Sequence, residues 1–414
     1  MTIIECFERD PLDNIATCLS LRADTLVFIG EKEEIDANIE KYRHFFGKRR
    51  PLVKILTQTV KYDDINEVIK TLIDIIKSGD ECVVDLSGGD EVVVAAAGAV
   101  YAQYKNEYPI TLQRINAKTG DAEDCDGDGE AMMLLDPTIT IDELIKLYGG
   151  IAVPEALPDD EITVDSIRPI WNAVTRDPLL WNRKVGALND FEKHSGATKT
   201  NIHVTINFNQ LKNTFAKYEE KLELLNNLID DLDEFDIIKI HSRNDGELRY
   251  TYRTPFFRRC LRKAGNALEL KTLLEAKSLN KNGQPVFNDC LVGVTIDWDG
   301  VLHKSIPGGI KDTRNEIDVI LMNGLIPIFI SCKNGDIEEE ELYKLNTVAE
   351  RFGGNKAKKV LIATKCLPDN EDSKKSLLQR AKDMNIYLEP DAASLTSDEW
   401  HNLFFNIIEQ KSIK

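Results

Sequence analysis

The feature that most constrains the fold is a regular alternation of short apolar runs and amphipathic segments, which continues up to Tyr104. The run Thr25-Leu-Val-Phe-Ile-Gly30 is continuously apolar, as is typical of a strand covered by helices on both faces. Strands are expected at 2–7, 25–30, 51–57 and 82–86, and helices at 13–21, 35–46, 65–77 and 91–104. The alternation predicts a doubly wound, Rossmann-like α/β domain over residues 1–150, with an antiparallel hairpin extension at 109–136.

The 414 residues exceed one typical domain, and two further regions are expected. Pro154 and Pro158 flank an acidic stretch that predicts a boundary, so residues 151–252 would form a linker and a small helical, winged-helix-like connector. Residues 253–414 read as a second α/β domain, with helices at 264–279 and 338–352 and strands at 290–297, 316–322, 327–332 and 359–364.

The connector contains a heptad pattern of apolar residues from Leu211 to Leu232. Gaps alternating between four and three residues predict one apolar stripe on a long helix. This stripe would pack into the core of its own domain or, alternatively, form a contact between two subunits. A hairpin is expected at 237–252, around the turn Asn244-Asp-Gly246.

Composition excludes several classes of protein. The 52 basic and 70 acidic residues give a net charge of −18, which argues against a general nucleic-acid coat protein. The longest uncharged run, 92–104, is too short to span a membrane. Eight cysteines and six histidines are scattered without CxxC or paired-histidine spacing, which argues against disulfide frameworks and zinc sites. We therefore expect a reduced, soluble, cytoplasmic protein without a membrane partner.

A first candidate site is the segment Asp85-Leu-Ser-Gly-Gly-Asp-Glu91, between an expected strand and an expected helix. Glycines allow close approach of the backbone to a ligand, and a helix N-terminus offers free N–H groups to phosphate. The loops after neighbouring parallel strands would line the same crevice. The candidate ligand-binding residues are therefore Ser87, Gly88, Gly89, Asp90, Arg9, Asp10, Asn14, Gly30, Glu31, Lys32 and Thr57. A plain turn with a helix cap is the alternative.

This strand, the Leu86-Ser-Gly-Gly-Asp90 turn and the alanine-rich helix that follows resemble the CARF domain, the Rossmann-like sensor of CRISPR systems. The resemblance covers residues 1–150. It implies a homodimer that binds a cyclic oligoadenylate, often cyclic tetra-adenylate, across its two-fold axis through loops that follow the parallel strands.

A second candidate site lies on two apolar strands joined by the turn Asn323-Gly324. The two-residue period of a strand puts Glu316 and Asp318 on one face, and puts Ser331 and Lys333 together on the next strand. The register across the turn would bring Asp318 near both. A buried acid beside a buried lysine is costly unless the two pair or hold a metal, so a structural salt bridge is the alternative.

This pattern is similar to the PD-(D/E)xK core of restriction-endonuclease-like nucleases. The resemblance implies that Asp318 binds a divalent metal, that the main-chain carbonyl of Cys332 completes the metal site, and that Lys333 activates water. Glu269, one helix upstream, corresponds to a further metal-binding acid of the family. Ser331 stands where the family has its second acid, so Glu316 or Glu269 would supply the missing charge. Glu338–Glu341 reads as a charged first helical turn.

Two other segments each allow a functional and a structural interpretation. Arg249–Lys263 interleaves basic and aromatic residues, which suits contact with nucleic acid or, equally, an amphipathic core helix with a solvated basic side. The segment that begins at Asp124 imitates a calcium loop but has Leu135 where a glutamate is needed, so it reads as a polar hairpin tip.

Together, a CARF-like sensor, a connector and a PD-(D/E)xK-like domain resemble the ancillary nucleases of type III CRISPR systems. The resemblance implies a homodimer that a cyclic oligoadenylate activates and that then cleaves DNA or RNA with Mn²⁺ or Mg²⁺. The expected catalytic residues are Lys333, Asp318, Glu269 and Glu316, and the expected metal ligands are Asp318, Glu269 and Cys332. The alternative is a non-catalytic, ligand-responsive regulator that binds nucleic acid and carries a degenerate nuclease fold.

Overall fold

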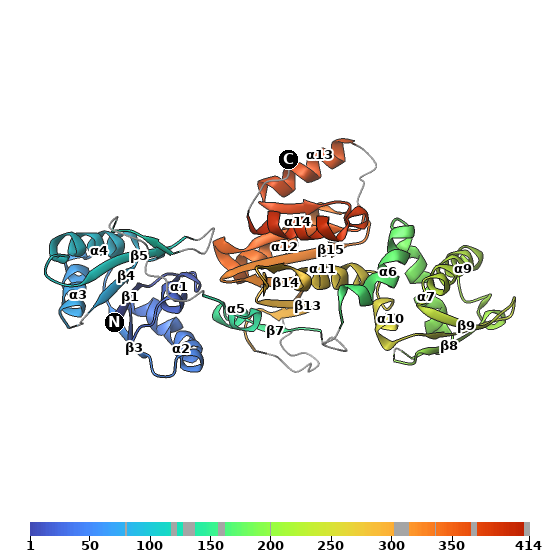
Figure 1. Cartoon of the computed structure of the whole chain (residues 1–414), viewed down its shortest axis with the longest axis horizontal. Helices are drawn as coiled ribbons and strands as arrows, with labels where there is room; N and C mark the ends of the chain where they lie inside the picture. Colours follow the sequence, from blue (N-terminus) through green and yellow to red (C-terminus); the bar gives the residue numbers. More distant parts are fainter. Residues whose placement is uncertain are drawn as a thin grey trace.

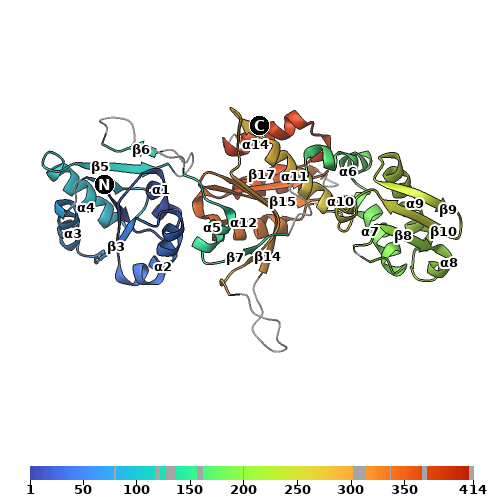
Figure 2. The ribbon, with the colours of Figure 1, turned by 60° about the horizontal axis from the view of Figure 1, so that its bottom comes forward.

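The computed structural model describes residues 1–78, 81–116, 122–126, 137–155, 162–198, 200–301, 314–335, 337–365 and 371–409. Three folded units follow one another along the long axis of the molecule (Figure 1). The first strands and helices lie at one end, the C-terminal α/β unit lies in the middle, and the connector lies at the other end (Figure 2). The chain thus reaches the far end before it returns to build the middle unit.

The first unit is a six-stranded sheet in the order β3-β2-β1-β4-β5-β6. All neighbours are parallel except the pair β5–β6. The strands are β1 (Thr2–Cys6), β2 (Thr25–Gly30), β3 (Lys54–Thr59), β4 (Cys82–Asp85), β5 (Ile110–Ile115) and β6 (Ala122–Asp124). The expected doubly wound α/β class is therefore confirmed, and β5 and β6 form an antiparallel hairpin at its edge. The later part of the calcium-like loop lies outside the described residues.

Two helices cover each face of this sheet. The pair α1 (Asp13–Ser20) and α2 (Lys32–Arg49) packs on one face, and the pair α3 (Ile65–Ser78) and α4 (Glu91–Tyr104) packs on the other. The edge strand β3 is largely exposed, but the inner strands β1, β2 and β4 are buried on both faces, with at most one partly exposed residue each. This explains why they read as continuous apolar runs rather than as alternating ones.

The middle unit is a second six-stranded sheet, in the order β17-β16-β15-β14-β13-β7. Strands β7 (Ile151–Val153), β13 (Asp289–Asp297), β14 (Arg314–Asn323) and β15 (Ile326–Lys333) are antiparallel, whereas β16 (Lys358–Ala363) and β17 (Ile386–Glu389) run parallel to β15. Helix α5 (Ile141–Leu147) also packs on this sheet, beside β7, β13 and β14. The expected domain ranges 1–150 and 151–252 are therefore corrected, since α5 from the expected first domain and β7 from the expected linker both belong to the middle unit.

Helices cover both faces of the second sheet as well. One face carries α11 (Asn266–Ser278) and α14 (Ser397–Ile408), and the other carries α5, α12 (Glu339–Gly353) and α13 (Glu371–Asp383). Two short hairpin strands, β11 (Asn280–Lys281) and β12 (Gln284–Pro285), and the 3₁₀ turns η1 (Gly354–Lys356) and η2 (Ala392–Ser394) complete the unit. The predicted helices and strands of residues 264–364 are confirmed, with ends that differ by at most two residues.

The connector has the winged-helix arrangement expected from the sequence. Its elements are α6 (Val164–Arg176), α7 (Trp181–His194), β8 (His203–Asn207), α8 (Phe208–Leu211), α9 (Tyr218–Glu234), β9 (Ile238–Arg243) and β10 (Glu247–Tyr252). The three strands form an antiparallel sheet in the order β8-β10-β9, with the Asn244–Gly246 turn at the tip of the hairpin. Helix α10 (Pro255–Cys260) then leads to α11.

The heptad pattern belongs to the core of the connector. Helix α9 begins only at Tyr218, so the first positions of the pattern lie in α8 and in the turn that follows it. Leu225, Ile229 and Leu232 are fully buried within their own chain, mainly against α7. The core interpretation is confirmed, and the subunit-contact interpretation is wrong because the apolar stripe is already covered.

One hydrophobic cluster joins the first and second units. It contains residues of the α1–α2 face, such as Phe28 and Phe46, and residues of the second sheet and its cover, such as Phe329 and Phe352. A bidentate ion pair flanks it: Nε and Nη2 of Arg49 on α2 donate to the two carboxylate oxygens of Glu143 on α5, at 2.7 and 2.6 Å. The two units therefore share buried apolar surface and do not merely touch. Within the described residues, no helix combines the length and apolarity needed to cross a bilayer.

We expect Phe329→Ala to destabilise the protein by about 3–5 kcal/mol, because it deletes a fully buried ring from this shared cluster. Leu52→Ala is the control, since Leu52 is 97% exposed and its truncation should cost less than about 0.5 kcal/mol. Urea unfolding followed by tryptophan fluorescence measures both variants. Equal midpoints for the two variants would show that the cluster does not stabilise the fold.

Candidate functional site

The strands β14 and β15 separate at the position of Asp318. Their ladder runs from Asn323 opposite Ile326 to Val319 opposite Ile330 and stops there, while β15 continues to pair with β16 as far as Lys333. Asp318 is the first residue beyond the ladder. Its Oδ2 accepts a hydrogen bond from the Cys332 N–H at 2.6 Å and one from Ser331 Oγ at 3.3 Å. A carboxylate thus takes the place of the next ladder bond and lies in the gap between the strands.

The main-chain carbonyl of Cys332 faces the same gap. Successive residues of a strand direct their peptide groups to opposite edges, and the Lys333 carbonyl accepts the Thr364 N–H at 2.9 Å on the β16 side. The Cys332 peptide groups therefore point toward β14, as the N–H bond to Asp318 confirms. The Cys332 thiol lies in the core, 3.7 Å from Thr272 Oγ1, and burial raises its pKa well above the ordinary range. Only the carbonyl oxygen of Cys332 is suited to bind a hard cation.

Glu269, in the first turn of α11, brings a second acid to this gap. Burial raises the pKa of Glu269 to about 8, and the negative charges of Asp318 and Glu316 add to that shift. Burial also raises the pKa of Asp318, although the Cys332 N–H and the charge of Lys333 oppose it. Glu316 is more exposed and pairs with Lys263 at 3.6 Å. The acids singled out in the sequence are therefore close enough to repel one another.

Lys333 lies beside this acidic gap, but its direct partner is on another helix. Its Nζ is 2.7 Å from Oε2 of Glu341 in the first turn of α12, and both side chains are less than one-third exposed. Lys333 still favours the charged form of Asp318. Sequence reasoning missed Glu341 because the run Glu338–Glu341 reads as an ordinary acidic first turn. The run does lie at the acidic start of α12, and its last member, Glu341, also pairs with Lys333.

The donor set suits a hard divalent cation. Two partly buried carboxylates, Asp318 and Glu269, and the carbonyl of Cys332 supply oxygen ligands, and burial raises the pKa of both acids. In the described part of the chain, no three His, Cys, Asp or Glu side chains converge on a single metal position. The Ser331 hydroxyl stands where a third carboxylate would complete such a cluster.

The first unit places a second site at its topological switch point. The neighbouring strands β1 and β4 are followed by helices on opposite faces of the sheet, so the loops after them diverge and leave a crevice. In that crevice, the Gly89 N–H donates to Oε2 of Glu8 at 3.1 Å. Gly89 has φ +104°, and a Cβ there would lie 2.5 Å from Cys6 Cβ, while one on Gly88 would lie 2.6 Å from Glu8 Cβ. The glycines allow the loop to lie directly on the end of β1.

The side chains of three candidate ligand-binding residues form hydrogen bonds within the protein. Ser87 Oγ donates to Asp85 at 2.6 Å and accepts the Ile115 N–H at 2.7 Å. Asn14 is buried and pins the loop after β1, because its amide bonds the main chain of Glu8 in both directions. Asp10 accepts a hydrogen bond at 2.5 Å from the hydroxyl of Tyr148, which directly follows α5 on the second sheet. These three side chains order the crevice and the contact behind it.

The other candidate ligand-binding residues have different structural roles. Asp90 caps α4 by accepting the Val92 N–H at 2.9 Å, so the helix-cap interpretation holds for this residue. The side chain of Arg9 is 88% exposed and pairs with Glu34 at 3.3 Å, while Gly30, Glu31 and Lys32 form the turn from β2 into α2. The expected placement of Thr57 in a loop is wrong. Strand β3 ends at Thr59, so Thr57 lies within the strand, opposite Phe28.

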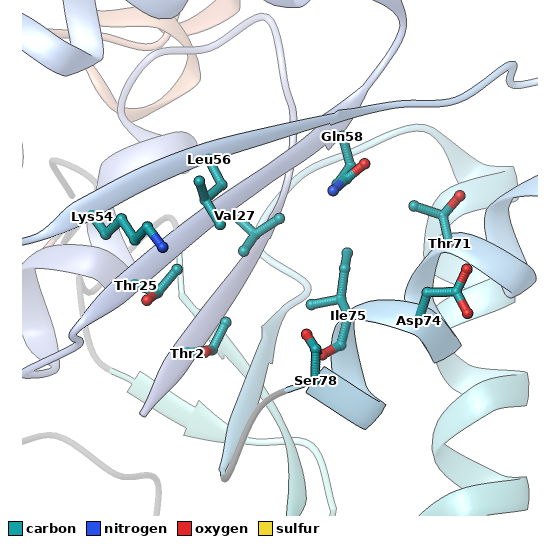
Figure 3. Close-up of a pocket in the computed structure, with 10 residues that line it drawn as sticks. All are labelled: Thr2, Thr25, Val27, Lys54, Leu56, Gln58, Thr71, Asp74, Ile75 and Ser78. Carbon is teal, nitrogen blue, oxygen red and sulfur yellow. The ribbon is translucent and has the colours of Figure 1, made fainter.

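Two hollows lie on the first unit. One of about 320 Å³ adjoins the loop after β1 and is lined by Phe7, Arg9, Glu33, Glu34, Ala37 and Asn38. The other, of about 390 Å³, lies between α3 and the amino ends of the strands, where Thr2, Thr25 and Lys54 surround it (Figure 3). Because ligands of such sheets bind outside the carboxyl ends of the strands, only the first hollow belongs to the crevice.

The basic and aromatic stretch from Arg249 to Lys263 is mainly structural. Tyr250 and Tyr252 are buried and donate to Oε1 of Glu192 at 2.5 and 2.7 Å, and Arg258 pairs with the same carboxylate at 3.1 Å. Arg259 pairs with Glu155 at 3.2 Å. The stretch is therefore structural, but it is not the expected helix with a solvated basic side: it is divided between β10 and α10, and the side chains of Arg258 and Arg259 are only 6% and 11% exposed. Burial of the two tyrosines excludes stacking of bases on them.

Comparisons with known proteins agree with this architecture. No protein-family model matches the chain, and no curated protein sequence matches it either. Among solved structures, protein VC1899 from Vibrio cholerae is similar over 99% of this chain and 97% of its own, with 17% identity and a TM-score of 0.69. Can2 from Sulfobacillus thermosulfidooxidans, solved in complex with cyclic tetra-adenylate, is similar over 98% and 97%, with 15% identity and a TM-score of 0.65. The whole three-unit fold is therefore shared with these proteins.

The raised pKa of Glu269 has a consequence for stability without metal. A carboxyl whose folded pKa is about 8 favours folding while it holds its proton, and that contribution is lost as the pH rises from its ordinary pKa toward 8. With chelator present, we expect Glu269→Gln to be more stable than the parent by about 1–3 kcal/mol at pH 9 and equal to it at pH 4.5. Unfolding midpoints across pH measure this. A constant difference at all pH values would show that Glu269 is not the titrating group.

Proposed function

We propose that this protein is a nuclease of type III CRISPR defence that a cyclic oligoadenylate activates and that hydrolyses phosphodiesters of DNA, RNA or both with Mn²⁺ or Mg²⁺. The observation that carries the proposal is the gap between β14 and β15, where the partly buried acids Asp318 and Glu269, the Cys332 carbonyl and Lys333 meet. The fold shared with a protein solved in complex with cyclic tetra-adenylate supports the sensor half of the proposal.

Each residue of the gap has a role in this hydrolysis. Asp318, Glu269 and the carbonyl of Cys332 would hold the cation, and Glu316 would complete the negative charge that Ser331 does not supply. When bound there, the divalent cation polarises the scissile phosphate and lowers the pKa of the attacking water. Lys333 places a positive charge beside the phosphate, where negative charge grows in the transition state. Burial keeps a proton on Glu269 in the metal-free protein, and cation binding would release that proton.

The crevice of the first unit would bind the activator. A cyclic tetra-adenylate carries phosphates that suit the N–H groups of the Ser87–Gly89 turn and the N-terminus of α4. The Arg9 side chain and Lys32 add positive charge at the rim of the crevice. Because such a ring has two-fold symmetry, two copies of the chain reading one ring is the simplest arrangement, and we propose a homodimer.

The alternative function, a non-catalytic regulator that reads nucleic acid, meets an electrostatic obstacle. In a winged helix, the second helix of the helix-turn-helix pair enters the major groove, and α9 holds that position here. Its exposed residues are mainly acidic: Glu219, Glu220, Glu223, Asp230, Asp233 and Glu234. A helix with this charge is repelled by phosphates, so the catalytic interpretation is favoured.

We expect Lys333→Ala to lower the rate of plasmid or RNA cleavage by about 10²–10³-fold in the presence of Mn²⁺ and cyclic tetra-adenylate, because a positioned charge at a developing anion is lost. Asp318→Asn should be at least as damaging. Lys217→Ala, which removes an exposed lysine of the connector, is the control and should cleave at the parent rate. Equal rates for Lys333→Ala and Lys217→Ala would refute the assigned active site.

We expect the protein to be a dimer in light scattering at micromolar concentration and to bind one cyclic tetra-adenylate per two chains in calorimetry. Arg9→Ala and Lys32→Ala should each weaken binding by about tenfold, because each removes one charge from the rim of the crevice. A monomer both with and without ligand, or one ring bound per chain, would contradict the proposed sensor.

A further inference from the structure

The ion pair between Lys333 and Glu341 engages the lysine on which the proposed hydrolysis depends. The two charged groups are 2.7 Å apart, and the side chains are only 31% and 23% exposed. In such partly screened surroundings, a charge-assisted hydrogen bond is stronger than a surface ion pair. While this ion pair persists, the Lys333 ammonium points toward α12 and not only toward the gap that holds Asp318. Release of Lys333 thus requires movement of the first turn of α12.

Helix α12 connects that ion pair to the first unit. Its buried face, which includes Leu342, Leu345, Val348 and Phe352, packs on β15 and β16, so the helix moves as one body. At about 1.5 Å per residue, its fifteen residues separate its two ends by about 20 Å. Its last residue, Gly353, is followed directly by the η1 turn, which lies against the first unit.

The far end of α12 contacts the loop that follows β1. The Lys356 ammonium forms an ion pair with the Asp13 carboxylate, and Lys356 is almost fully buried. Gly354 has φ +54°, and a Cβ on it would overlap the Asp10 carboxylate, which leaves no room for a side chain. Tyr148, which follows α5, donates to Asp10 at 2.5 Å. Asp10 and Asp13 thus bind the loop after β1 to the chain around η1.

The same loop reaches the crevice of the first unit. Glu8, two residues before Asp10, accepts the Gly89 N–H at 3.1 Å. Asn14 bonds both peptide groups of Glu8 and also the Asp10 carbonyl, so the loop after β1 and the first two residues of α1 are held together as one segment, here called the 8–14 loop. A phosphate that takes the Gly89 N–H must displace the Glu8 carboxylate, since two anions cannot share one donor without repulsion. Displacement of Glu8 would therefore shift Asp10 and Asp13 with it.

We infer that Glu341 is a latch that holds Lys333 in a resting position, and that binding of a cyclic oligoadenylate releases it through Glu8, the 8–14 loop and α12. This inference rests on the proposed function and adds its regulation. The ligand favours the released state because its phosphate makes, with Gly89, the contact that Glu8 makes in the resting state. Glu341 is thus a positioning residue, and Asp10, Asp13, Tyr148 and Lys356 transmit the change.

The latch is tested at its active-site end by Glu341→Gln, with the neighbouring Glu340→Gln as a matched control. Glu340 is exposed and pairs with Lys344, not with Lys333. We expect Glu341→Gln to raise cleavage without cyclic tetra-adenylate by about tenfold, with the activated rate changed by less than about twofold, and Glu340→Gln to match the parent. An unchanged activator-free rate, or a fall in the activated rate alone, overturns the latch.

The transmission is tested at its sensor end by Tyr148→Phe, which removes only the hydroxyl that bonds Asp10. The control is Tyr343→Phe, which removes a hydroxyl from α12 itself, where its partner is Arg380. We expect Tyr148→Phe to reduce activation by cyclic tetra-adenylate by about fivefold without weakening its binding in calorimetry, and Tyr343→Phe to leave both unchanged. Parent-like activation of Tyr148→Phe contradicts the route.

A readout that needs no cleavage separates this inference from the proposed function. We expect cyclic tetra-adenylate to increase amide hydrogen exchange at residues 339–344 of the parent protein, and to do so less in Tyr148→Phe. A parent that shows this increase but never cleaves would retain the route and refute the nuclease. A parent that cleaves on activation without any change in exchange on α12 would retain the nuclease and overturn the route.

Discussion

The arrangement of the molecule depends on the apolar cluster that the first two sheets share. Buried side chains of α1 and α2 and of the second sheet with α5 and α12 form one continuous cluster. Because interiors are close-packed and transmit strain, a displacement on one side of this cluster is passed to the other side. The polar contacts at its margin, Arg49 with Glu143, Tyr148 with Asp10 and Lys356 with Asp13, couple the two units further.

At the gap between β14 and β15, the fold gathers more negative charge than its own cations balance. Raised pKa values of Glu269 and Asp318 record that imbalance, because like charges in a desolvated site favour protonation. An enzyme gains from this only if a cation binds there, since the metal-free site costs stability above neutral pH. Ser331 lessens the imbalance by one charge. A serine hydroxyl is a poorer ligand for a hard cation than a carboxylate, so Ser331 would weaken a metal site here without changing the fold.

Much of the fold could be predicted from the sequence because its inner strands are buried on both faces and read as uninterrupted apolar runs. The hairpin that carries Asp318 was also predictable, but its turn was expected one residue too early: Asn323 pairs with Ile326, so the turn residues are Gly324 and Leu325. Thr57 was misplaced because Pro51 and Leu52 form a turn that delays β3 by three residues. The heptad pattern allowed both a core helix and a subunit contact, and only tertiary packing against α7 distinguishes them.

What the sequence could not show are contacts between residues far apart in the chain. The pairing of Lys333 with Glu341 and that of Asp13 with Lys356 depend on how α12 lies across the sheet, which no local pattern encodes. Likewise, Ser87, Asn14 and Asp10 have the residue types of ligand-binding groups, but their hydrogen bonds stay within the protein. Polar side chains at a crevice often form the hydrogen bonds that the main chain of its loops requires, and they are then not available to a ligand.

The most direct test of the central claim is anomalous scattering from crystals of the protein grown with Mn²⁺ and cyclic tetra-adenylate. The account predicts a manganese peak in the gap between β14 and β15, coordinated by the carboxylates of Asp318 and Glu269 and by the carbonyl of Cys332. A peak at any other position, or an empty gap at saturating Mn²⁺ with the activator bound, would contradict it.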